Sequence, residues 1–151
     1  DVIDDVKARL RVDVDRVYLT GLSMGGRGTY IVAAVYPEVF AALMPLSSHH
    51  TPYSYVPLAP RVAHIPIWTS HGDRDSVSSH DVAAEMVSAL EYLESNVTFV
   101  SIPREGHGGW EKVFRRASTF EWLLSHRRNI QERKKVKKSL HRHRFCVIFL
   151  T

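Results

Sequence analysis

Residues 19–30 read Leu-Thr-Gly-Leu-Ser-Met-Gly-Gly-Arg-Gly-Thr-Tyr, and this stretch decides the fold class. Within it, Gly21, Ser23 and Gly25 form a G-x-S-x-G pattern between a β-prone run and a helix-prone run. A sharp turn of this kind lifts the serine hydroxyl clear of the backbone, and the residues two before and two after it must lack side chains. The pattern predicts a nucleophilic Ser23, with the backbone N–H of Met24 as an oxyanion donor. The alternative is a Gly-rich turn whose serine only caps the helix.

The rest of the chain alternates between short apolar runs and helical patterns. We expect strands over residues 16–20, 40–46, 65–70 and 97–102, and helices over residues 1–11, 25–36, 82–93 and 110–126. Three prolines between residues 47 and 63 predict a long loop with one turn of helix. Strands that alternate with helices predict an α/β fold, with a parallel sheet of about four strands covered by helices on both faces.

An acid and a base follow two of the predicted strands. Asp73 and Asp75 come after the strand at 65–70, and His107 comes after the strand at 97–102. In open α/β sheets, sites lie beyond the carboxyl ends of the strands, so these side chains are expected near Ser23. His107 is then the general base, and one of the two aspartates orients its ring. The chain order Ser, Asp, His is that of α/β-hydrolases.

These motifs together resemble the serine esterase branch of the α/β-hydrolase superfamily. Within it, the chain is similar to phospholipase/carboxylesterases, dienelactone-hydrolase-like proteins and predicted peptidases related to prolyl oligopeptidases. The resemblance rests on Gly21–Tyr30, on residues 36–42, on the H-G-x-x-D-x-V pattern at 71–77, on the G-H-x-x-W pattern at 106–110, and on residues 120–128. It covers residues 1–128 and implies that Asp75, the later aspartate of its motif, is the catalytic acid.

The resemblance also implies an activity and an incomplete fold. It implies hydrolysis of a carboxylic ester through an acyl-serine intermediate, with no cofactor. An amide hydrolase of the oligopeptidase type has the same triad and stays open as an alternative, as does an inactive fragment that acts through its tail. The matching part is the C-terminal half of the fold, so the second oxyanion donor is expected to be missing. The strand at 16–20 then becomes a sheet edge that invites self-association.

The charge of the chain is concentrated at its C-terminus. The net charge is +4, but residues 129–151 hold seven Lys/Arg and one acid, whereas residues 1–128 hold 13 Lys/Arg and 15 Asp/Glu. The body therefore carries no nucleic-acid signature, and no apolar run is long enough to span a membrane. We expect residues 1–128 to form the domain and residues 129–151 to lie outside it. The single cysteine, Cys146, excludes a disulfide framework.

Four further side chains are candidates for the lining of a substrate pocket. They are His49, His50, Tyr53 and Trp110, which follow predicted strand ends or lie in the adjoining loop. Together with His71 and His107, the two histidines could also suggest a metal ion, but their spacing matches no closed ligand set, so no metal is expected.

Overall fold

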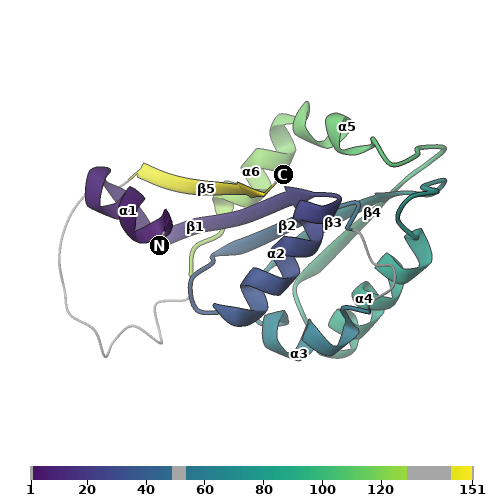
Figure 1. The fold of residues 1–151 in the computed structure, drawn as a ribbon, viewed down its shortest axis with the longest axis horizontal. Helices are drawn as coiled ribbons and strands as arrows, with labels where there is room; N and C mark the ends of the chain where they lie inside the picture. The colour runs from purple at the N-terminus through teal and green to yellow at the C-terminus, as the bar shows by residue number, and fades with distance from the viewer. Residues whose placement is uncertain (1, 49–53, 129–143, 151) are drawn as a thin grey trace.

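The computed structural model describes residues 2–48, 54–128 and 144–150. Helices and strands alternate along these residues (Figure 1). The elements are α1 (Val2–Arg9), β1 (Val12–Leu22), α2 (Met24–Val35), β2 (Ala42–Leu46), the 3-10 helix η1 (Val56–Leu58), α3 (Ala59–Val62), β3 (Ile67–Gly72), α4 (His80–Tyr92), β4 (Val97–Ile102), α5 (Trp110–Phe114), α6 (Ala117–Ser125) and β5 (Arg144–Leu150). Among these described helices, none combines the length and the hydropathy that crossing a membrane requires.

The predicted α/β class and the four predicted strands are confirmed. One predicted helix differs, because the segment at 110–126 forms two helices, α5 and α6, rather than one. The break lies at Arg116, whose backbone is extended (φ −98°, ψ 121°). The hydroxyl of Thr119 donates a hydrogen bond to the Val113 carbonyl at 3.0 Å, so a side chain satisfies an acceptor at the end of α5.

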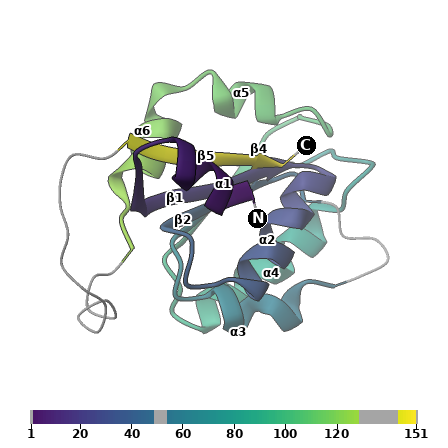
Figure 2. The same ribbon diagram turned by 60° about the vertical axis from the view of Figure 1, so that its left-hand side comes forward.

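The strands form one parallel sheet in the order β4-β3-β2-β1-β5. Helices cover both faces, with α2, α3 and α4 on one side and α5 and α6 on the other (Figures 1 and 2). Alternate residues of a strand face opposite layers. Val17 and Leu19 of β1 accordingly belong to the core beneath α2 and α4, whereas Tyr18 packs in the core beneath α5 and α6.

The C-terminal segment corrects the predicted domain boundary. We expected residues 129–151 to lie outside the domain, but β5 pairs in parallel with β1, where Leu19 is in register with Ile148 and Gly21 with Leu150. Ile148 packs against the core beneath α2. The physical reason is that residues 145–150 of β5 are β-branched, aromatic or otherwise apolar, which suits a pleated surface beside the mostly apolar second half of β1.

The same pairing corrects the predicted sheet edge. Strand β1 was expected at an edge, where it would favour self-association. In the described chain, β1 lies between β2 and β5, and the edges of the sheet are β4 and β5. The strand that carries the turn at Ser23 is therefore held from both sides.

Candidate active site

Ser23 stands at the turn between β1 and α2, in a strained conformation. Its φ is 54° and its ψ is −117°, which a residue with a side chain rarely adopts. The backbone N–H of Ser23 donates to the carbonyl of Leu46 at the end of β2, at 2.9 Å. This hydrogen bond connects the carboxyl ends of β1 and β2 next to the serine. The surrounding fold therefore maintains the strained backbone conformation of Ser23.

Gly26 gives this turn the room it needs, and the sequence analysis did not single it out. A Cβ atom at Gly26 would lie 2.7 Å from the Leu46 carbonyl oxygen and 3.2 Å from the Gly21 carbonyl oxygen. Both are backbone atoms and cannot rotate away. The first turn of α2 can approach β1 and β2 this closely only because residue 26 lacks a side chain. The signal in the sequence was the second glycine of the Gly25-Gly26 pair.

His107 connects the serine to an aspartate. Its Nε2 lies 2.7 Å from Ser23 Oγ, and its Nδ1 lies 2.7 Å from Asp75 Oδ2. An ionised carboxylate can only accept, so Nδ1 carries the proton and Nε2 offers a lone pair to the serine hydroxyl. The three groups come from the carboxyl ends of β1, β3 and β4. They form a continuous chain of hydrogen bonds from Ser23 through His107 to Asp75, here called the relay. The side chain of His107 is 22% exposed, whereas that of Asp75 is fully buried.

The surroundings of Asp75 keep its carboxylate ionised. Burial raises the pKa, but hydrogen bonds from Ser78, His107 and Val77 oppose it, and the net effect is a pKa below the usual value. The backbone N–H groups of Val77 and Ser78 both donate to Asp75 Oδ1, at 2.9 Å and 2.8 Å. The loop after β3 thus turns its own amides onto the acid that faces His107.

Gly72 sets the distance between two loops. One is the acid loop, residues 73–79, which carries Asp75, and the other is the histidine loop, residues 103–109, which carries His107. A Cβ atom at this position would lie 2.3 Å from the Glu105 carbonyl oxygen and 2.4 Å from that of Gly106. The backbone N–H of Arg74 also donates to the Glu105 carbonyl at 2.9 Å. The residue before His107 therefore rests directly on the end of β3. The only signal for Gly72 in the sequence is its place in the H-G-x-x-D-x-V pattern.

Of the two candidate acids, the structure brings Asp75 to His107. Asp73 is exposed, and its backbone N–H donates to the Ile102 carbonyl at 3.2 Å. Met24 begins α2, in the first turn, where helix N–H groups have no partner within the helix. Trp110 stands edge-on to the imidazole of His107, with ring centroids 5.1 Å apart.

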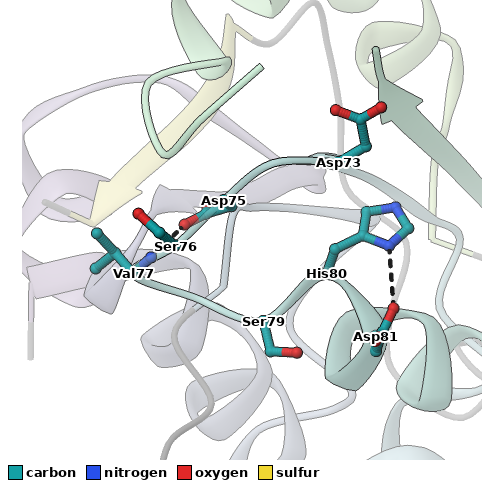
Figure 3. Close-up of a pocket in the computed structure, with 7 residues that line it drawn as sticks. All are labelled: Asp73, Asp75, Ser76, Val77, Ser79, His80 and Asp81. Atoms are coloured by element: carbon teal, nitrogen blue, oxygen red, sulfur yellow. Dashed lines mark hydrogen bonds and ion pairs between the residues drawn. The ribbon is translucent and has the colours of Figure 1, made fainter. Parts of the chain in front are cut away.

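The remaining pocket candidates, His49, His50 and Tyr53, lie outside the described residues. Within the described part of the chain, no three His, Cys, Asp or Glu side chains are grouped to hold a metal ion. An open, polar hollow lies beside the acid loop (Figure 3). It is lined by Asp73, Asp75, Ser76, Val77, Ser79, His80 and Asp81. Because this lining includes neither Ser23 nor His107, the hollow is not where an ester would meet the serine.

Comparison with known proteins identifies the family. Residues 1–124 match the model of the phospholipase/carboxylesterase family. The chain belongs to this family. The recognition of an α/β-hydrolase of the esterase type from its motifs is thereby confirmed.

Relatives of this phospholipase/carboxylesterase family member include enzymes that act on esters. A 46-residue stretch, 30% of the chain, is 46% identical to poly(3-hydroxyalkanoate) depolymerase C from Paucimonas lemoignei, of which it covers 11%. The crystal structure of a thermostable esterase superposes with a TM-score of 0.77 at 28% identity, over 84% of this chain and 35% of the esterase.

A more distant structure shares the fold alone. A protein assigned as a dienelactone hydrolase, from Klebsiella pneumoniae subsp. pneumoniae, superposes with a TM-score of 0.62 at 23% identity, over 82% of this chain and 52% of that protein. The chain thus spans about a third of the thermostable esterase and about half of the dienelactone hydrolase.

Proposed function

We propose that this chain carries a serine hydrolase site that cleaves carboxylic esters through an acyl-serine intermediate. The observation that carries the proposal is the relay itself, in which His107 lies 2.7 Å from both Ser23 Oγ and Asp75 Oδ2. These distances are within the hydrogen-bond reach that general-base catalysis requires. Membership of the phospholipase/carboxylesterase family and the named activities of the relatives favour an ester over other acyl compounds.

The proposed reaction has two halves. In the first, Nε2 of His107 takes the hydroxyl proton while Ser23 Oγ bonds to the ester carbonyl carbon. The tetrahedral intermediate collapses, the bond to the alcohol oxygen breaks, and His107 returns the proton to that leaving oxygen. In the second half, His107 takes a proton from a water whose oxygen bonds to the acyl carbon. The bond from that carbon to Ser23 Oγ then breaks, His107 returns the proton to Oγ, and the carboxylic acid is released. Asp75 stabilises the imidazolium in both halves, and the N–H of Met24 faces the oxyanion.

The expected rate is low for these 151 residues alone. The family resemblance implies two oxyanion donors; the motifs of this chain, which spans about a third of the thermostable esterase, assign one, the N–H of Met24. Loss of one donor typically lowers turnover by about 10²–10³-fold. A covalent probe that reports the reactivity of the serine is therefore a better first assay than turnover.

The test is labelling with a fluorophosphonate, followed by mass spectrometry of the modified peptide. We expect modification of Ser23, and none in Ser23→Ala or His107→Ala. Ser125→Ala is a matched control, because its hydroxyl lies on α6 and donates to the Trp122 carbonyl. Absence of labelling in the folded wild-type chain would refute the proposal and favour an inactive fragment.

A substrate panel then identifies the leaving group. p-Nitrophenyl esters of short and medium acyl chains, a 3-hydroxybutyrate ester and peptide p-nitroanilides are compared at equal enzyme concentration. We expect turnover of the esters. Faster cleavage of the anilides would show that the substrate is an amide rather than an ester, with the same roles for Ser23, His107 and Asp75.

A further inference from the structure

His71 is a buried histidine beside the relay that the proposed reaction does not use. It is the fifth residue of β3, and 1% of its surface is exposed. In the sequence it stands first in the H-G-x-x-D-x-V pattern and is one of the four histidines considered for a metal ion. The N–H of a buried imidazole needs an acceptor, because an unsatisfied polar group inside a protein is costly. The partners of His71 therefore indicate what it does.

Those partners are two oxygens of the acid loop. His71 Nε2 lies 2.9 Å from the carbonyl oxygen of Ser78 and 3.2 Å from Asp75 Oδ2. A carbonyl oxygen can only accept, so Nε2 must carry a proton. This fixes the tautomer of His71 and places one N–H between the Ser78 carbonyl and the Asp75 carboxylate.

We propose that His71 is a positioning residue, whose Nε2–H, shared between Asp75 and Ser78, fixes the carboxylate that orients His107. This inference rests on the proposed hydrolase function. The proposal places a second histidine at Asp75 Oδ2, the oxygen that also faces His107. The two histidines differ in role, because His107 gains and loses a proton during the reaction, whereas His71 keeps its proton throughout.

The contacts around Asp75 show why a fixed donor matters. Oδ1 accepts from the amides of Val77 and Ser78, and Oδ2 faces both His107 and His71. These four donors use the acceptor capacity of a carboxylate. Among the described residues, loss of His71 would leave Oδ2 with His107 alone, the group that changes its charge during the reaction. His71 thus gives the carboxylate an anchor that is independent of the reaction.

Ser78 connects this anchor to the rest of the sheet. Its amide donates to Asp75 Oδ1, its carbonyl accepts from His71, and its hydroxyl donates to the carbonyl of Ser48, just beyond β2. Ser78 is fully buried. The acid loop therefore encloses the imidazole of His71 and is hydrogen-bonded to the segment that follows β2, the neighbouring strand in the sheet.

The charge of His71 suits this role. Burial is the largest effect on its pKa and lowers it; the Ser78 carbonyl and Asp75 act in the opposite direction, and His80 and His107 add to the lowering. His80 reaches it from α4, with its ring edge-on at a centroid distance of 5.9 Å. At neutral pH the net effect leaves His71 uncharged, so it donates a hydrogen bond to Asp75 without competing electrostatically with the imidazolium of His107.

The test uses nuclear magnetic resonance of the ¹⁵N-histidine-labelled full chain, which needs no turnover. At neutral pH we expect His71 to be neutral with its proton on Nε2, and we expect a downfield proton signal from the His107 Nδ1–H bonded to Asp75. His71→Phe keeps a flat ring but removes the donor, and should weaken or abolish that downfield signal. His71→Gln keeps an N–H donor and should restore it.

Kinetics and a control separate positioning from general stability. In His71→Phe we expect kcat to fall by about 10–100-fold with KM changed by less than about threefold, because the lost interaction orients the general base rather than binds substrate. Thr69→Val is the control, since the buried Thr69 hydroxyl on the same strand donates to the Pro45 carbonyl at 2.7 Å and not to Asp75. It should lower the melting temperature and keep the downfield signal.

Three results would overturn the inference: a proton on Nδ1 alone, a charged His71 at neutral pH, or a folded His71→Phe that keeps both signal and kcat. If His71→Phe does not fold, the tautomer in the wild type and the signal in His71→Gln decide the matter. Failure of the proposed function looks different. In that case fluorophosphonate does not label Ser23, while the tautomer of His71 and the His107 signal are still measured.

Discussion

Gly72→Ala is expected to inactivate the site without touching any of its three reacting groups. The new Cβ would lie 2.3 Å from the Glu105 carbonyl oxygen, whereas real Cβ atoms essentially never come within 3.0 Å of such an atom and seldom within 3.4 Å. The histidine loop must then retreat by about 0.7–1.1 Å, the difference between these distances. Both obstructing groups are backbone atoms, so no side-chain rotation relieves the contact.

The retreat acts directly on the relay, because Glu105 and Gly106 immediately precede His107. If His107 follows its loop directly away from the serine, its Nε2 moves from 2.7 Å to as far as about 3.4–3.8 Å from Ser23 Oγ, at or beyond hydrogen-bond reach. A misplacement of about 1 Å can lower a rate by roughly 10²-fold. We therefore expect ester turnover and the rate of fluorophosphonate labelling to fall by about that factor, with an overpacking cost of about 1–3 kcal/mol in the free energy of unfolding.

The matched control for this experiment is Gly106→Ala. It adds the same methyl group to the same contact region, but a Cβ atom at Gly106 meets nothing within 4 Å. We expect its labelling rate to stay within about threefold of the wild type, since surface changes of this kind have small effects. Both variants are assayed at a temperature well below their measured melting points. A folded Gly72→Ala that labels Ser23 at the wild-type rate would refute the reasoning.

Three further predictions concern the acid, a buried histidine and the last strand. Asp75→Asn should lower kcat by about 10³–10⁴-fold, since the His107 tautomer is lost, whereas Asp73→Asn should change it little; the reverse order would reassign the acid. Burial lowers the pKa of His71, so below pH of about 6.5 the unfolded chain binds a proton that the folded chain excludes. The free energy of unfolding, measured with urea, should fall as the pH decreases from 7 to 5, and less steeply in His71→Gln. Ile148→Asp should lower that free energy by about 2 kcal/mol or more, because Ile148 packs against the core; unchanged stability would place β5 outside the folded unit.

Much of this site could be predicted from the sequence because its chemistry is local. The G-x-S-x-G turn at Ser23 depends on side-chain volume within five residues, and the strands depend on short apolar runs. The carboxyl ends of parallel strands meet at one edge, so the order of the motifs along the chain is enough to predict that His107 lies near the serine. The domain boundary at residue 129 was wrong for residues 144–150, because pairing between β1 and β5 joins segments more than 120 residues apart, which no local pattern reports.

Only the tertiary structure decided which groups touch. Asp73 and Asp75 carry the same side chain, and in the sequence only the resemblance to a family motif favoured Asp75; the contact itself depends on how the loop turns its amides onto Asp75 Oδ1. Gly72 is an ordinary strand residue until the histidine loop, some 30 residues later, is brought against it. His71 has no recognisable role until burial removes water and leaves Asp75 and Ser78 as its partners. For Gly72 the deciding quantity is a distance of a few ångströms to a segment some 30 residues later in the chain. For Asp75 and His71 it is the conformation and burial of the single loop that follows β3, and both exist only after the sheet has formed.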